Sequence, residues 1–327
     1  MRLGLAASVI GLGLVAQLGL AASADAGGLP VAKGVPGTVA ADPEGLTTPP
    51  GPDRYLRLST PRGTMIARVE RDGGALLRAR SFKGELSIPA VAYDGSPGGL
   101  SADGRTLILL PSQPAGAKTR FVVLDAKQLQ VRDRITLPGR FSFDAISSDG
   151  SRMFFIEYLS RFDLTRYAVR EYDLSSGRLL PDPVVDPDEP PGDMQGTAVA
   201  RVNSPDGRWA YTLYDGDEYP FIHALDTAEG RAVCIDLDSI AGYRGPRSLE
   251  LTSDPDGSEL SLVDRKRGPR AVLDTQTFEV SLPSEQAGGG GFPWVAVAMI
   301  PVALVAAWAL ALVVRRRRHG VAPGDAR

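Results

Sequence analysis

The chain has 327 residues, a formal net charge of −3 and 43% hydrophobic residues, which suits one large domain or two ordinary ones. Nucleic-acid binding usually shows a basic domain or stripe, so this acidic balance excludes a nucleic-acid partner. Gly (37) and Pro (26) are abundant while aromatic residues make up 7%, which favours many turns and short strands over a helical bundle.

Residues 1–26 resemble a secretory signal peptide. Arg2 supplies the positive charge, residues 3–20 are apolar, and Ala24 and Ala26 form a small-residue cleavage pattern. The alternative is an uncleaved anchor, because the apolar run is long for a signal. Residues 27–52, with six glycines and six prolines, are predicted to be a linker.

Residues 53–285 contain a repeat with a period of about 50 residues. A turn ending in Asp-Gly recurs, and a β-rich run ending in Asp follows it. The turns end at Asp103-Gly104, Asp149-Gly150, Asp206-Gly207 and Asp256-Gly257, and the runs end at Asp125, Asp173, Asp226 and Asp274. Asp-Gly between strand-like runs predicts a type I′ hairpin turn. The second Asp is expected to hold a further turn by accepting bonds from backbone N–H groups.

The pattern therefore predicts that each repeat unit forms four antiparallel strands, as in a propeller blade. Strands are expected at residues 106–110, 153–158, 209–214 and 259–263, and a partial unit ahead of them predicts strands at 55–59, 65–70 and 75–82. The sequence thus predicts an all-β fold, a β-propeller of about five four-stranded blades. One route to ring closure pairs N- and C-terminal strands in one blade. An open arc and a larger ring are the alternatives.

Two stretches allow a family resemblance to be named. Ser204-Pro205-Asp206-Gly207 followed by a strand, and Val272-Leu273-Asp274-Thr275, resemble the YVTN-type and TolB- or WD40-like propeller repeats of exported bacterial envelope proteins. The resemblance covers roughly residues 55–283. It implies a blade architecture and no particular chemistry, because these motifs are structural.

Loop lengths indicate where a ligand would bind. The Asp-Gly and Asp-initiated turns are short and should share one face of the propeller. The remaining inter-strand and inter-blade loops are long and varied, so we expect the binding surface on this opposite, long-loop face. Its two acidic loops give the candidate ligand-binding residues Tyr214, Asp215, Asp217, Glu218, Tyr219, Asp186, Asp188 and Glu189. Neither loop fits a Ca²⁺-loop template, and no metal or other cofactor is expected.

The C-terminal end predicts one transmembrane helix. Residues 286–293 form a Gly-rich hinge, and residues 294–314 are apolar without a charge, enough to span a bilayer. The basic tail, 315–327, opens with the stop-transfer cluster Arg315, Arg316, Arg317 and Arg318. These features predict a single-pass type I protein of a bacterial cell membrane, with its globular domain outside. The alternative is a surface-sorting signal, in which a protease removes the helix.

No catalytic residue is predicted. His223, inside a strand, is expected to be a core or channel residue, and the lone Cys234 is expected to be buried. Ser-His-Asp hydrolysis and His-based metal sites are therefore disfavoured, whereas carboxylate-pair hydrolysis is not excluded.

Three functions are compatible with these observations. The first is a non-enzymatic propeller that binds a protein or cell-envelope ligand. The second is a lactonase- or glycosidase-type hydrolase that uses carboxylates, with bound Ca²⁺ as an option. The third is an envelope scaffold or sensor. An apolar or plugged channel would favour the binding protein, and a dense acidic cluster at the centre would favour the hydrolase.

Overall fold

The computed structural model describes residues 46–47, 51–72, 74–111, 117–160, 162–189, 194–216, 219–240 and 248–283. The chain divides into two units, Met1–Val280 and Ser281–Arg327, and nearly all of the described residues belong to the first. The expected signal peptide (1–26), membrane helix (294–314) and arginine cluster (315–318) lie outside the described residues. Within those residues, no helix is long and apolar enough to cross a membrane.

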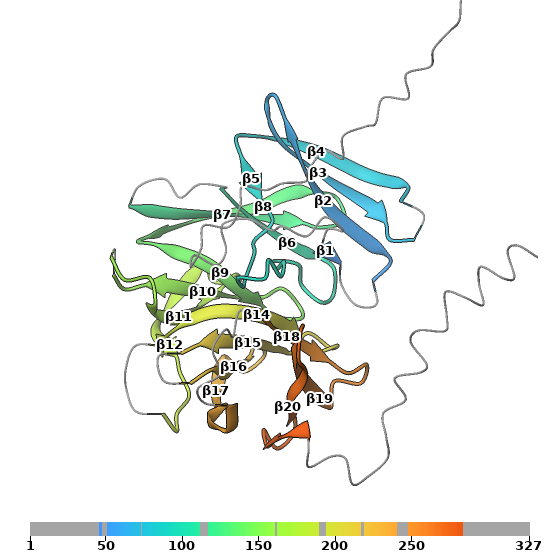
Figure 1. Cartoon of the computed structure of the whole chain (residues 1–327). Coiled ribbons are helices and arrows are strands. Elements are labelled where there is room, and N and C mark those ends of the chain that lie inside the picture. Colours follow the sequence, from blue (N-terminus) through green and yellow to red (C-terminus); the bar gives the residue numbers. More distant parts are fainter. Residues whose placement is uncertain are drawn as a thin grey trace, which may run out of the picture. The chain divides into compact units, whose positions relative to one another are not determined.

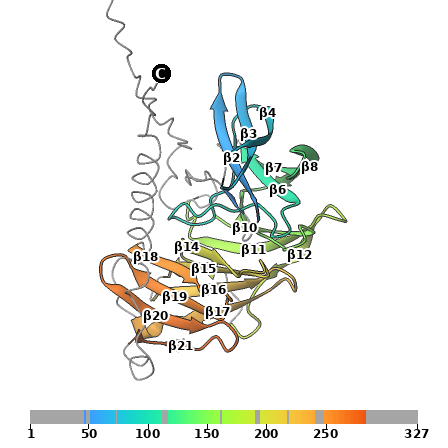
Figure 2. The same ribbon diagram turned by 90° about the vertical axis from the view of Figure 1, so that its right-hand side faces the viewer.

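Five antiparallel sheets follow one another along the chain, each built from consecutive strands (Figures 1 and 2). The first contains β1 (Leu46–Thr47), β2 (Asp53–Thr60), β3 (Gly63–Glu70) and β4 (Leu76–Lys83). The second contains β5 (Leu86–Ser87), β6 (Thr106–Pro111), β7 (Lys118–Asp125) and β8 (Gln130–Pro138). The third contains β9 (Phe141–Ile146), β10 (Arg152–Tyr158), β11 (Arg166–Asp173), β12 (Arg178–Val184) and the short β13 (Met194–Gln195).

The fourth sheet contains β14 (Thr197–Asn203), β15 (Trp209–Asp215), β16 (Phe221–Asp226) and β17 (Arg231–Asp236), followed by the 3-10 turn η1 (Asp238–Ile240). The fifth contains β18 (Leu249–Ser253), β19 (Glu259–Asp264), β20 (Gly268–Asp274) and β21 (Val280–Ser281). The predicted all-β class and the four-stranded unit are confirmed. The strands expected after the four Asp-Gly turns are β6, β10, β15 and β19, and the β-rich runs end β7, β11, β16 and β20 at the expected aspartates.

The type I′ prediction for the Asp-Gly turns is wrong. Among the described residues other than glycine, only Leu129 and Phe278 have a positive φ, so the turn aspartates do not have the conformation that type I′ requires. The N–H of Gly104 instead donates to the carbonyl of Ser101 at 2.9 Å. This is a four-residue turn with Ser first and Gly fourth, the preference of type I.

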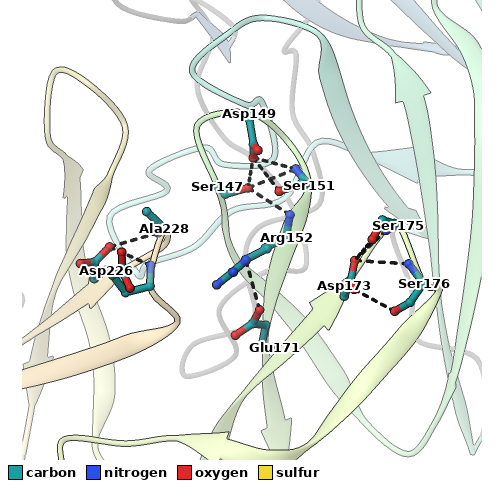
Figure 3. A network of polar contacts seen from close by, with 11 residues as sticks. Ser147, Asp149, Ser151, Arg152, Glu171, Asp173, Ser175, Ser176, Asp226 and Ala228 are labelled. Atoms are coloured by element: carbon teal, nitrogen blue, oxygen red, sulfur yellow. Dashed lines mark hydrogen bonds and ion pairs between the residues drawn. The ribbon is translucent and has the colours of Figure 1, made fainter.

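The serine explains the repeat better than the Asp-Gly pair alone does. In the third sheet, the N–H of Arg152 donates to Ser147 Oγ at 3.0 Å, and that hydroxyl donates to Asp149 Oδ1 at 2.7 Å (Figure 3). The bond from the Ser147 side chain is the main cause that lowers the pKa of Asp149. Ser101 and Ser204 accept backbone N–H groups in the same way, and Asp254 takes this place in the fifth sheet.

The prediction for the second, Asp-initiated turn is confirmed. Asp173 accepts the N–H of Ser175 at 2.7 Å and the hydroxyl of Ser176 at 2.9 Å (Figure 3). Hydrogen bonds from these two serine side chains are the largest causes that lower the pKa of Asp173 to about 2. Asp226 holds the equivalent turn of the fourth sheet by accepting the N–H of Ala228 at 3.0 Å.

Turns of successive sheets also contact one another. The N–H of Asp103 donates to the carbonyl of Ser148 at 3.0 Å, and Ser148 Oγ donates to the carbonyl of Asp206 at 2.8 Å. Gly207 has a φ of +72°, and a Cβ atom there would lie 2.4 Å from the Cβ of Ala102. Gly207 is therefore required by both its backbone conformation and the close approach of the second sheet's turn.

The core consists of four clusters, each between two successive sheets. Strands are buried on both faces: in β10, Met153 and Phe155 pack toward the second sheet, while Phe154 and Ile156 pack toward the fourth. The remaining clusters join the first sheet to the second and the fourth to the fifth. Among the described residues, no cluster joins the fifth sheet to the first and no strand is shared between them. Closure through a shared blade is thus not observed in the described part.

A loop of the second sheet, residues 90–97, crosses to the fourth sheet; we call it the crossing loop. Val91 N–H donates to the carbonyl of Ser96 at 2.9 Å, which closes the loop on itself. The N–H groups of Tyr93 and Asp94 then donate to the carbonyls of Ala198 and Val199 in β14, at 2.9 and 3.1 Å. The loop therefore lies against the inner strand of the fourth sheet.

Candidate functional site

A row of polar side chains crosses the face of the fourth sheet that packs on the third. Arg201, Thr212, His223 and Cys234 are cross-strand neighbours in β14, β15, β16 and β17. Arg201 Nε donates to Thr212 Oγ1 at 2.7 Å, and His223 Nδ1 lies 3.8 Å from Cys234 Sγ. Most other residues of this interface are apolar, so the row is a polar exception within a packed core.

The inner end of the row is a buried ion pair. Arg201 Nη2 donates to Asp144 Oδ1 of β9, and Arg201 Nη1 donates to the carbonyl of the same residue at 3.1 Å. The two side chains are 5% and 3% exposed. The second carboxylate oxygen, Asp144 Oδ2, is buried and has no hydrogen-bond partner. A buried carboxylate oxygen without a donor is costly, so it indicates either strain or a place for an additional donor.

A cavity of about 310 Å³ lies beside this ion pair. Most of its lining comes from residues 91–102, which include three residues of the crossing loop, from β9, and from β14 with the turn that follows it; Ala210 and Thr227 complete the lining. Asp144 is the one carboxylate among its lining residues, which also include Arg201, Asn203, Ser96 and Phe143. The second, third and fourth sheets therefore all contribute to the lining of this cavity, which includes both residues of the Arg201–Asp144 ion pair.

This arrangement bears on the choice between hydrolase and binding protein. A glycosidase needs two carboxyl groups across the reacting bond, and the residues lining the cavity supply one, which is paired with Arg201. Within the described ranges, no group of three or more His, Cys, Asp or Glu residues is placed to hold a metal ion. Among the described residues, the lining of this cavity is therefore not a dense acidic cluster.

His223 and Cys234 occupy the outer half of the polar row. His223 is buried, and desolvation is the main cause that lowers its pKa to about 4. Burial likewise raises the pKa of Cys234 to about 12, so this thiol stays protonated and unreactive. The predicted core position of His223 agrees with its burial, whereas Cys234 is half-buried rather than fully enclosed.

The structure separates the candidates of the loop at 214–219. Tyr214 is 2% exposed and stacks on Tyr167 and Phe221, with ring centroids 5.6 and 5.1 Å apart. Its side chain therefore belongs to the core between the third and fourth sheets and cannot contact a ligand at the surface. Asp215 ends β15, and the Tyr219 hydroxyl lies 3.3 Å from Asp236 Oδ2. Asp217 and Glu218 lie outside the described residues.

The second acidic loop has one structural and two exposed carboxylates. Asp186 Oδ2 accepts the N–H of Cys234 at 2.7 Å, and Oδ1 accepts the N–H of Asp188 at 2.9 Å. Asp186 therefore ties the inter-sheet loop to β17. Asp188 and Glu189 are exposed beyond it and stay ligand-binding predictions.

The long-loop face of the third sheet exposes three large apolar side chains. Phe162 is 100% exposed, Leu159 47% and Val185 49%. The loop carrying Phe162 is held by its own hydrogen bonds, since Ser160 Oγ accepts the N–H groups of Phe162 and Asp163 at 3.1 and 3.0 Å. This face therefore presents an exposed aromatic side chain on a loop whose backbone is held by hydrogen bonds.

No family model matches the chain, and no curated protein matches it. Hydrazine synthase from Kuenenia stuttgartiensis is similar over 72% of this chain and 64% of its own, just under two thirds, with 13% identity and a TM-score of 0.43. The Cps50 (Swd1) β-propeller domain of Myceliophthora thermophila matches over 72% and 69%, with 10% identity and a TM-score of 0.44. A putative TolB from Agrobacterium tumefaciens matches over 72% and 77%, with 16% identity and a TM-score of 0.42.

Proposed function

We propose that this chain is an extracytoplasmic binding protein, anchored by its C-terminal apolar segment, whose propeller-like domain captures a protein or cell-envelope ligand on the long-loop face. One observation carries the proposal: the fully exposed Phe162 ring on an internally hydrogen-bonded loop. Binding hot spots are enriched in aromatic side chains, and an exposed apolar patch with a polar rim is typical of an interaction site.

The surroundings of Phe162 support the same surface. Leu159 and Val185 are exposed apolar side chains of the same long-loop face, and the exposed Asp188 and Glu189 add negative charge to the loop that follows Val185. Protein interfaces combine an apolar centre with a polar rim. The buried Tyr214 contributes indirectly, because its stacking on Tyr167 and Phe221 fixes the two sheets that present these loops.

A photo-reactive cross-linker in the living cell tests this surface. p-Benzoylphenylalanine in place of Phe162 is expected to give a discrete cross-linked adduct of the full chain. The control places the same residue at Leu76, which is also exposed (65%) but lies on the first sheet, and should give none. An adduct at both positions, or at Leu76 alone, would refute the long-loop face as the binding surface.

The same surface predicts a loss of affinity. Once the adduct identifies the partner, Phe162→Ser should weaken its binding by at least tenfold, since a hot-spot aromatic contributes about 2 kcal/mol or more. Leu76→Ser should leave the Kd within about twofold, a change of less than 0.5 kcal/mol. Equal loss in both variants would mean that the effect comes from general destabilisation.

A further inference from the structure

The central cavity is a second candidate site, distinct from the long-loop face. Its lining includes Ala102, Ser204, Gly207 and Thr227, which belong to the Asp-Gly and Asp-initiated turns. The cavity therefore lies toward the turn end of the inner strands, and the loop of Phe162 belongs to the opposite end. Its volume of about 310 Å³ falls at the lower end of the range of about 300–1,000 Å³ that small-molecule sites occupy.

The polar groups around the cavity leave unused hydrogen-bonding capacity. Asp144 Oδ2 is a buried acceptor without a donor. Arg201 uses one N–H of each terminal nitrogen toward Asp144, and each of those nitrogens has a second N–H. Asn203 is exposed, and its side chain makes no hydrogen bond to the described residues. The site thus offers the Asp144 carboxylate as a hydrogen-bond acceptor and the Arg201 guanidinium as a donor. The Asn203 amide can both donate and accept.

The charge of the site limits the ligand class. Asp144 is already neutralised by Arg201, so either a cationic or an anionic ligand would add an uncompensated charge beside this buried pair. A neutral molecule with several hydroxyl groups avoids this cost. Each hydroxyl can donate to a carboxylate oxygen and accept from an N–H group.

We propose that this cavity binds a small neutral polyhydroxylated ligand, of the size of one or two sugar units, between the crossing loop and the inner strands β9 and β14. A ligand hydroxyl donates to Asp144 Oδ2, and another exchanges hydrogen bonds with Asn203. The apolar part of the lining, including Val91, Leu100, Phe143 and Ile146, suits the C–H faces of a sugar ring. Binding requires no covalent step.

Ligand-observed NMR on the full-length protein in detergent micelles tests the ligand class. The probes are glucose and N-acetylglucosamine as neutral sugars, glucosamine as a cation and glucuronate as an anion. At least one neutral sugar is expected to show saturation transfer and to bind at least tenfold more tightly than either charged analogue. If all four fail to bind at millimolar concentration, or if a charged analogue binds best, the proposal is wrong.

Two variants test the location. Asn203→Ala removes an exposed amide without touching the ion pair and should weaken sugar binding at least tenfold. Gln276→Ala removes an exposed amide from the β20–β21 turn and should change nothing. Unchanged binding in Asn203→Ala would overturn the site. Because neither variant lies near Phe162, the adduct expected there is unaffected by the outcome, and the two proposals can fail separately.

A longer ligand distinguishes free sugar from envelope glycan. The cavity accommodates one or two units, so N-acetylglucosamine and its tetramer are expected to bind with similar affinity if only a chain end enters. Tetramer binding that exceeds monomer binding by tenfold or more would contradict a site confined to this cavity.

Discussion

Replacing Arg201 with methionine is expected to lower the free energy of unfolding by about 3–5 kcal/mol, the usual effect of removing one partner of a buried ion pair. The variant leaves the Asp144 carboxylate enclosed with one hydrogen-bond donor fewer at Oδ1 and none at Oδ2. Urea unfolding of the full-length protein, followed by far-ultraviolet circular dichroism, measures the change.

A double-mutant cycle separates the ion pair from simple loss of packing. Asp144→Leu together with Arg201→Met should recover most of the loss, because no uncompensated charge then stays in the core. The matched control is Arg265→Met. Arg265 pairs with Glu250, but the two side chains are 58% and 44% exposed, so the expected loss is below about 1 kcal/mol. Equal losses at Arg201 and Arg265 would show that the Asp144 site is open to water.

Acidification is expected to destabilise the protein through protonation of the buried His223. Burial lowers the pKa of His223 from 6.5 to about 4, so the unfolded chain binds a proton that the folded chain excludes. The stability that depends on neutral His223 is complete above pH 6.5 and is lost as the pH falls toward 4. The difference between these two pKa values corresponds to about 3 kcal/mol of unfolding free energy.

The pH profile of wild-type protein and His223→Gln measures this effect. Urea midpoints should fall between pH 6.5 and 4.5 in the wild type and stay level in the variant, since glutamine does not take up a proton. Asp149 and Asp173 have lowered pKa values, so their contributions are lost only at lower pH. His319→Gln, in the tail, is the control and should keep the wild-type profile. A level profile in His319→Gln would show that His319, and not His223, causes the loss of stability.

The local structure of the blades could be predicted from the sequence because its signals are local. An Asp-Gly turn, an apolar run and a second aspartate lie within one unit, and β10 and β15 begin and end within one residue of their expected bounds. The type of the first turn was mistaken because the turn runs from Ser147 to Gly150, whose N–H donates to the Ser147 carbonyl at 2.9 Å, and Asp149 does not have the positive φ that type I′ requires. A serine could be seen in the motif, but its role depends on a hydrogen bond from the backbone N–H of the residue five positions later.

The centre could not be predicted in the same way because it depends on contacts between distant segments. Nothing in residues 90–97 indicates that Tyr93 and Asp94 bond to β14, about 100 residues later. The ion pair left a weaker signal: Asp144 is the one charged residue of β9 and Arg201 the one charged residue of β14, and burying a charge costs free energy unless it is paired. Sequence reasoning placed the tyrosines in acidic loops instead, and Tyr214 belongs to the core because β15 extends through it.

The measurement that tests the central claim most directly is a cross-link between the crossing loop and β14. In a Cys234→Ser chain, cysteines placed at Ser96 and Asn203, which line the same cavity, should be joined by a short bismaleimide, as detected by mass spectrometry of the digested protein. A pair at Ser96 and Ser176, on the β11–β12 turn of the third sheet, should stay unlinked. Linkage of the second pair but not the first would show that the second sheet does not reach across to the fourth, and that the central cavity does not exist.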